Sequence, residues 1–182
     1  MIDYTSYYKI NEYLEKDDMK ALKKYLEIER EKYYLKTARK ALMDYYKHDN
    51  FMKFYAYYID KLLLCDGYSI YILNSDEILT PSVKTRFFKP ERANRIINIY
   101  EASNKNFTTV TSIEKDKESL DGVVMQDDEG NSVLFNKNFI DTAKKFLGED
   151  EKIDYELNST GFACKMTSNK GKGLILGIKE KK

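Results

Sequence analysis

One order of secondary-structure elements is expected twice in this chain. Residues 32–73 have the pattern of a short strand, a helix and three strands, and residues 132–178 have the same pattern. The two copies share this order but not their residues. Together with a 42% hydrophobic content, which is enough to bury a core, the repeat predicts a folded α+β domain and rules out a wholly disordered chain.

The first copy begins with a short aromatic stretch, residues 32–36, that fits either a strand or the continuation of a helix. Thr37 is a good N-cap for the helix that we expect over residues 38–48. One side of that helix would be apolar, with Ala38, Ala41, Leu42 and Tyr45. The three expected strands cover residues 52–59, 62–65 and 68–73. Asp66-Gly67 is a strong turn signal between the last two.

The second copy begins with a strand at residues 132–135. Asn136 or Asn138 can cap a helix that ends at Leu147, and Gly148 is a fitting stop. Alternation of apolar and polar residues then predicts three strands. They lie near residues 153–157, 162–166 and 173–178.

Less regular segments precede and separate the copies. Residues 3–30 predict two short helices, or one helix broken near Asp17-Asp18, where either aspartate can act as a cap. Between the copies, the pattern of residues 93–100 fits either a helix or an extended segment. Strands are expected at residues 107–113 and 123–125, followed by a polar hairpin turn at residues 127–131. The predicted organisation is therefore an N-terminal helical extension, residues 1–31, and one domain, residues 32–182.

Two stretches of this pattern resemble the DNA sliding clamp family, the bacterial and phage polymerase processivity factors. Residues 62–72 resemble the clamp hairpin in which an apolar strand enters a Thr-Asp-Gly turn and an aromatic-rich strand, with Cys65 in place of the threonine. Residues 133–136, 139–147 and 173–178 resemble the last module of a bacterial clamp. The resemblance covers residues 32–182 and implies a processivity fold of two strand-helix-three-strand modules. Clamp chains carry two or three such domains, whereas this chain has room for one.

Positive charge is concentrated on the two expected helices. The chain has 31 basic and 30 acidic residues, a net charge of +1, yet residues 36–48 carry +3 and residues 137–147 carry +2. In clamps these helices line the DNA channel, so the resemblance implies phosphate contacts that do not read sequence. The DNA-binding residues implied are Lys36, Arg39, Lys40, Lys47, Lys137, Lys144 and Lys145. The alternative is that these are the ordinary charged outer faces of amphipathic helices.

The resemblance implies a non-enzymatic processivity accessory protein of a phage or mobile element. It would bind duplex DNA non-specifically and tether a DNA polymerase or another DNA enzyme. One domain cannot encircle a duplex, so this function requires a homo-oligomer. The second hypothesis is a protein-interaction or regulatory module of the same fold, which acts on a host complex through its N-terminal helices without binding DNA. Several tyrosines fit either core packing or a partner surface: Tyr4, Tyr7, Tyr8, Tyr33 and Tyr34.

We expect no catalytic site, metal site or cofactor. His48 is the only histidine and ends a helix, where a cation is ordinary. Two cysteines and one histidine cannot supply four zinc ligands. Residues 170–173 lack the phosphate-loop spacing, and residues 127–129 lack the spacing of a calcium loop.

The sequence also predicts a cytoplasmic protein that does not act at a membrane. Cys65 and Cys164 lie in apolar or alternating runs, where a buried free thiol is the ordinary interpretation. Free thiols fit a reducing compartment. No stretch approaches the roughly 18 apolar residues that a membrane-spanning helix needs.

Overall fold

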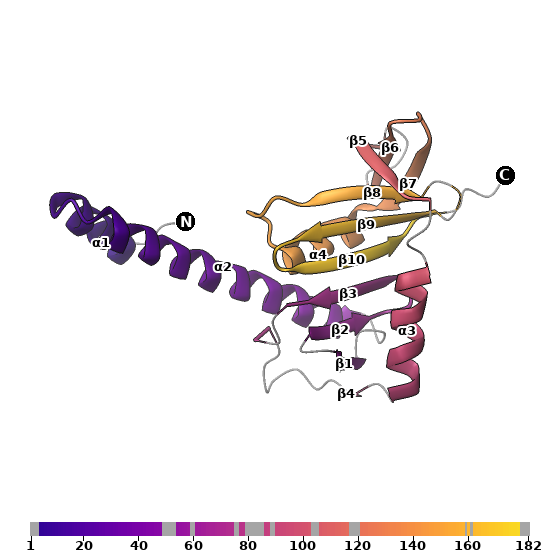
Figure 1. Cartoon of the computed structure of the whole chain (residues 1–182), viewed down its shortest axis with the longest axis horizontal. Coiled ribbons are helices and arrows are strands. Elements are labelled where there is room, and N and C mark those ends of the chain that lie inside the picture. Colours follow the sequence, from indigo (N-terminus) through magenta and orange to yellow (C-terminus); the bar gives the residue numbers. More distant parts are fainter. Residues whose placement is uncertain are drawn as a thin grey trace.

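The computed structural model describes residues 4–48, 54–58, 61–74, 77–78, 86–87, 90–102, 106–116, 121–158, 160 and 162–178. It shows an α+β fold in which N-terminal helices precede a mainly antiparallel sheet that packs against helices (Figure 1). The expected α+β class is confirmed. The helices are α1 (Tyr4–Glu15), α2 (Met19–His48), α3 (Pro90–Ala102) and α4 (Lys137–Leu147).

The described strands form one sheet in the order β4-β1-β2-β3-β10-β9-β8-β5-β6-β7. Their bounds are β1 (Phe54–Tyr58), β2 (Lys61–Cys65), β3 (Ser69–Leu73), β4 (Arg86–Phe87), β5 (Thr108–Lys115), β6 (Gly122–Asp127), β7 (Ser132–Asn136), β8 (Asp154–Asn158), β9 (Ala163–Ser168) and β10 (Gly171–Leu176). Strand β1 runs parallel to β4, and the other pairs are antiparallel. The last strands of the two copies, β3 and β10, pair directly, with Tyr71 opposite Gly173.

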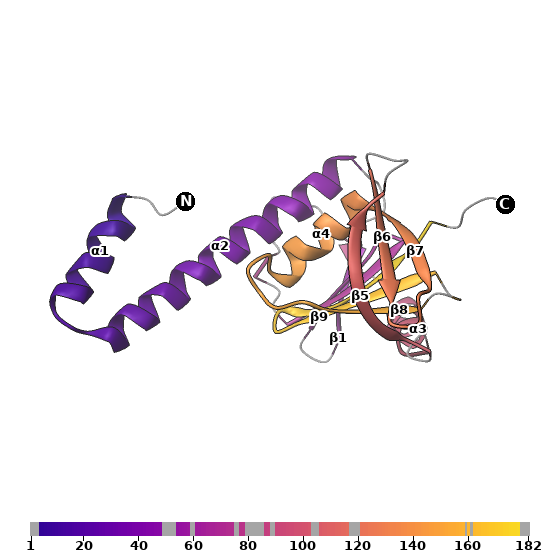
Figure 2. The ribbon, with the colours of Figure 1, turned by 90° about the horizontal axis from the view of Figure 1, so that it is seen from above.

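The sheet carries helices on both faces (Figure 2). The second half of α2 and all of α4 lie side by side on one face, and their buried side chains share a core with strands from β2 to β10. On the other face, α3 packs on a smaller cluster that includes Leu63 of β2 and Leu174 of β10. The sheet also curls, because Ile178, just after β10, forms a bridge with Leu134 of β7. The two lysine-bearing helices are therefore neighbours, as expected.

The second copy of the pattern is confirmed element by element, as β7, α4, β8, β9 and β10. In the first copy, the helix and its three strands are confirmed. Of the two alternatives for residues 32–36, the continuation of a helix is confirmed, because these residues belong to α2. The strand that the repeated pattern required is wrong, and Thr37 is therefore not an N-cap. Tyr34 explains the difference. It precedes Ala38 and Leu42 by four and eight residues, so all three lie on one helix face and enter the same core.

The break near Asp17-Asp18 is confirmed, and it separates α1 from α2. Asp17 takes a positive φ of 50°, which reverses the chain direction. The Asp18 carboxylate accepts a hydrogen bond from the Ala21 amide at 2.9 Å, so Asp18 caps α2. The boundary expected after residue 31 falls inside α2, which runs without interruption from the extension into the domain. In the middle segment, residues 93–100 are helical, in α3.

Candidate interaction surfaces

Helix α1 and the first half of α2 form an arm that projects from the rest of the molecule (Figures 1 and 2). We use the term arm for residues 4–31. Its two helices are joined by a ring contact between Tyr13 and Tyr25, whose centroids lie 5.8 Å apart, and by Lys9, whose ammonium lies 5.4 Å from the Tyr25 ring. Leu22 is buried but belongs to neither core cluster of the domain. The arm therefore folds back on itself rather than onto the sheet.

The arm exposes large apolar side chains. Leu14 is 51% exposed, Met19 59% and Leu26 46%. Their positions are regular, because Tyr7 and Leu14 are seven residues apart on α1, and Met19, Leu26 and Tyr33 are seven residues apart on α2. Residues seven apart lie on one face of a helix, as they do in coiled coils. Each helix of the arm thus presents an apolar stripe to solvent.

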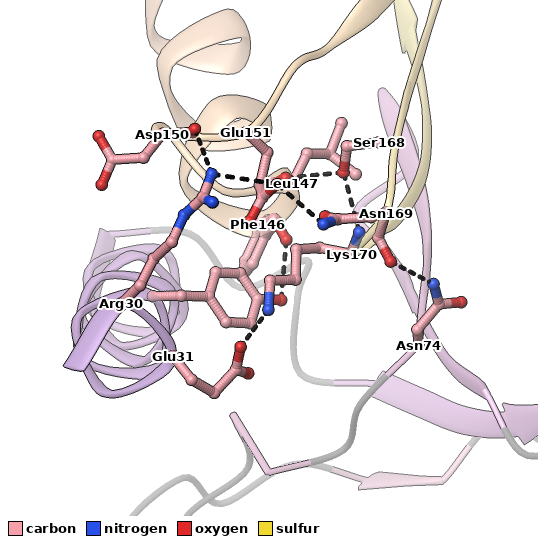
Figure 3. Close-up of polar contacts among 11 residues, drawn as sticks. Arg30, Glu31, Asn74, Phe146, Leu147, Asp150, Glu151, Ser168, Asn169 and Lys170 are labelled. Carbon is pink, nitrogen blue, oxygen red and sulfur yellow. Dashed lines mark hydrogen bonds and ion pairs between the residues drawn. The ribbon is translucent and has the colours of Figure 1, made fainter. Parts of the chain in front are cut away.

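Polar contacts fix α2 where the arm meets the domain (Figure 3). The Arg30 guanidinium donates a hydrogen bond to the Asp150 carbonyl at 2.6 Å and lies 3.3 Å from the Glu151 carboxylate. Glu31 forms an ion pair with Lys170 in the turn between β9 and β10. We call Arg30, Glu31 and Tyr34, the residues of α2 that make these contacts, the anchor.

Tyr34 is the buried member of the anchor. Its hydroxyl donates a 3.0 Å hydrogen bond to the Phe146 carbonyl in the last turn of α4, and the Lys170 ammonium lies 4.6 Å from the centre of its ring. Burial raises the pKa of the Tyr34 hydroxyl above its usual range, so the group stays protonated and remains a donor. The α4 end of this contact is itself held, because Ser168 donates to the Leu147 carbonyl at 2.7 Å. The anchor therefore sets the direction in which the arm leaves the domain.

The second candidate surface is the solvent side of α2 and α4. On α2, Lys36 and Lys40 are exposed. Arg39 is engaged within the molecule, because its guanidinium donates to the Glu77 carbonyl at 3.0 and 2.6 Å. Lys47 lies in the last turn of α2, and its side chain is outside the described residues. Two of the four basic residues predicted on α2 are therefore displayed to solvent.

On α4, the basic residues are less exposed. Lys137 forms an ion pair with Asp141 one turn later, and Lys144 and Lys145 are half-buried. Lys145 lines a small surface pocket together with Arg30, Tyr33 and the acidic residues 149–151. The cap of α4 is as expected, since the Asn136 side chain accepts from the Asn138 amide at 2.9 Å. The structure thus places α2 and α4, the helices that carry the predicted residues, on one face of the sheet, with acidic groups near those that are described.

The sequence also singled out the two cysteines and the polar turn at residues 127–131. Cys164 is buried, and burial raises the pKa of its thiol to about 12, while Cys65 is only half-buried. Asp127 closes the expected turn at residues 127–131 by accepting hydrogen bonds from the Asn131 and Glu129 amides at 2.8 and 3.1 Å. Within the described ranges, no group of three or more His, Cys, Asp or Glu residues is arranged to hold a metal ion.

Comparisons with known proteins gave no match: no family model, no curated protein and no solved structure is similar to this chain. None of the helices in the described part of the chain has the length and apolar character needed to cross a bilayer.

Sequence reasoning missed the exposed apolar stripe of the arm. Leu22, Tyr25 and Leu26 have the spacing of one apolar face, yet only Leu22 is buried and Leu26 faces solvent. The signal was present in the seven-residue spacing of Met19, Leu26 and Tyr33, which indicates a face for pairing with another helix.

Proposed function

We propose that this chain is a non-enzymatic protein-interaction module whose arm docks onto another protein chain. The observation that carries the proposal is the regular set of exposed apolar side chains on a projecting element. Full burial of an exposed Leu or Met side chain contributes about 1.5–3 kcal/mol, and Leu14, Met19 and Leu26 are each about half exposed, so covering each contributes about half of that value to a complex.

The anchor supports this function because it presents the stripe in a defined orientation. Arg30, Glu31 and Tyr34 hold α2 at the point where it leaves the domain, and α2 is one continuous helix of 30 residues. A docking helix that is already ordered loses less conformational entropy on binding than a disordered segment does. The domain then acts as the rigid body from which the arm is displayed.

A capture experiment with the full chain tests the proposal. The chain is immobilised through its C-terminus, and proteins retained from cell extract are compared between wild type and the variant Leu14→Ser/Met19→Ser/Leu26→Ser. We expect a partner that binds wild type and binds the variant at least tenfold more weakly once both purified components are titrated.

The matched control carries the same kind of change on the domain, at the exposed residues Ile113 and Leu176. Ile113→Ser/Leu176→Ser should capture the same proteins as wild type. Retention of the same proteins by the arm variant would contradict the proposal, provided that circular dichroism shows both variants folded.

A second function, clamp-like DNA binding, is favoured by one observation: α2 and α4 lie side by side on one face of the sheet. We propose as its fold basis a processivity-like domain in which helix-plus-three-strand units meet at the β3–β10 pair. The lysines that fit phosphate contacts are Lys36, Lys40, Lys144 and Lys145. Two features depart from the clamp pattern, namely the missing first strand and α3 on the opposite face.

Fluorescence anisotropy with a labelled duplex tests this second function. If four lysines contact phosphates, the logarithm of the affinity should fall with the logarithm of salt concentration with a slope of about −3.6. The variant Lys36→Glu/Lys40→Glu/Lys144→Glu/Lys145→Glu should abolish binding. Lys115→Glu/Lys172→Glu, changed at exposed sites on the sheet, should weaken binding much less. Absence of salt-dependent binding to duplex DNA by the wild-type chain would remove this function.

A further inference from the structure

We propose that the occupant of the arm is the arm of a second copy, laid antiparallel across it so that the pair has twofold symmetry about Leu26. This inference rests on the proposed function and names its partner. A twofold contact uses the same surface on both copies, so the surface must be complementary to itself. The arm meets this condition in its apolar residues, its charges and its two ends.

The apolar stripe of α2 is symmetric about its centre. Met19 and Tyr33 lie seven residues on either side of Leu26, which corresponds to about 10 Å of helix in each direction. In an antiparallel pair, Leu26 therefore meets Leu26 of the other copy, and Met19 meets Tyr33. All three side chains are at least 46% exposed in the single chain and would become covered.

The net charges on the two sides of Leu26 differ in sign. Residues 20–25 carry three lysines, a charge of +3, whereas residues 27–32 carry three glutamates, one arginine and one lysine, a net charge of −1, and Glu29 is paired with Lys32. An antiparallel arrangement brings the positive segment of each copy near the negative segment of the other. A parallel arrangement would bring the two segments of charge +3 together, which is unfavourable.

The two ends of the arm are also complementary. The turn between α1 and α2 is exposed and acidic overall, because it carries Glu15, Asp17 and Asp18 beside one lysine, Lys16, which is paired with Glu12. On the opposite side of Leu26, at a comparable number of residues, α2 exposes Lys36 and Lys40. In the antiparallel pair, the acidic turn of each copy therefore reaches the basic part of α2 in the other copy. The lysines considered above for DNA would be partly covered by this contact.

Sedimentation velocity of the purified full chain over a range of concentrations tests the inference. We expect a monomer–dimer equilibrium for wild type. Leu26→Glu places two carboxylates at the symmetry axis and should raise the dimer dissociation constant at least 100-fold. Leu176→Glu, a matched change on the exposed side of β10, should leave the dissociation constant within about twofold of wild type.

A charge exchange tests the antiparallel pairing. Lys23→Glu/Lys24→Glu and Glu27→Lys/Glu29→Lys should each weaken self-association at least tenfold, because like charges then face each other. An equimolar mixture of the two variants should form a mixed dimer with an affinity close to that of wild type, because a segment of net charge −1 again faces a segment of net charge +3 at each end. Since no residue of the core clusters is changed, circular dichroism should be the same for wild type and both variants.

Wild-type protein that remains monomeric at the highest concentration reached would overturn the inference, as would a dimer that Leu26→Glu leaves intact. A monomer that still captures other proteins through its arm would overturn the second copy as partner and leave the proposed function standing. Wild type could also dimerise while the arm variant captures the same proteins as wild type. That result would overturn the proposed docking of other proteins and support only the second copy as partner.

Discussion

At the scale of single residues, two adjacent tyrosines have opposite roles. Tyr34 is 5% exposed and connects α2 to α4 through its hydroxyl, whereas Tyr33 is 47% exposed and belongs to the apolar stripe of α2. From the sequence, both tyrosines fitted either core packing or a partner surface, because composition does not tell which face of a helix meets the core. The choice follows from helix phase: Tyr34 shares its face with Ala38 and Leu42, and Tyr33 shares its face with Leu26.

Tyr34→Phe should lower the free energy of unfolding by about 1–2 kcal/mol. The change removes the donor to the Phe146 carbonyl and leaves that buried acceptor without its partner. Urea denaturation measures the difference. Tyr33→Phe is the control and should change stability by less than about 0.5 kcal/mol, because its hydroxyl is on the exposed surface. Equal effects of the two substitutions would show that the anchor does not hold α2 in this way.

Asp127 should make stability depend on pH. Burial alone would raise the pKa of its carboxyl, but hydrogen bonds from Asn131, Thr108 and Glu129 outweigh burial and lower the pKa below its usual value. The stabilisation is therefore present at neutral pH and is lost as pH falls through the pKa of the folded state. Asp127→Asn should destabilise the protein at pH 7, and the difference from wild type should shrink near pH 3.

Urea denaturation at both pH values measures this dependence. The control is Asp128→Asn, which changes the exposed neighbouring residue in the same turn. A difference between wild type and Asp127→Asn that stays constant from pH 7 to pH 3 would show that the carboxylate charge is not what the turn requires.

At the scale of elements, alternation and capping signals were sufficient for the second copy. β7, α4 and the three strands that follow match their expected positions to within about two residues, because their sequences alternate or have helical spacing and clear stops such as Gly148 separate them. At residues 32–36 the same signals favoured a strand before a capped helix, whereas α2 continues through this segment. Thr37 looks like a cap only if the helix begins there, and the partner that keeps Tyr34 in a helix, the Phe146 carbonyl, lies 112 residues away.

A proline at residue 36 distinguishes the two interpretations of this segment. In a continuous α2, Lys36→Pro removes a hydrogen bond in the helix interior and should cost about 3 kcal/mol or more. If the helix began after Thr37, a proline at this place would precede the cap and be tolerated. Lys36→Ala is the control for loss of the side chain. Urea denaturation of the three proteins provides the comparison.

At the scale of the whole molecule, the sequence predicted the adjacency of α2 and α4 but not the arm. The twofold order of elements placed two helices on one sheet face, which the structure shows. The projection of residues 4–31 depends on contacts with no local pattern, such as those of Arg30 with Asp150 and Glu151. The apolar face of α3 follows helical spacing in the sequence, but no local pattern tells which face of the sheet it covers.

Removal of residues 1–26 should leave the domain folded. Both core clusters draw on residues from Tyr34 onward, and the truncated chain keeps the anchor residues Arg30 and Glu31. We expect a single cooperative unfolding transition with a free energy within about 1 kcal/mol of the full chain. Loss of the cooperative transition in this variant, observed by circular dichroism with urea, would show that the arm is part of the core.

Hydrogen exchange of the full chain at low and high protein concentration reports on whether the arm is a docking element filled by a second copy. Amides of residues 19–31 should exchange more slowly as concentration rises, because burial of the stripe suppresses fraying of this part of α2. Amides of β9 and β10 serve as an internal reference and should not change. Equal exchange of residues 19–31 at all concentrations would contradict docking between copies.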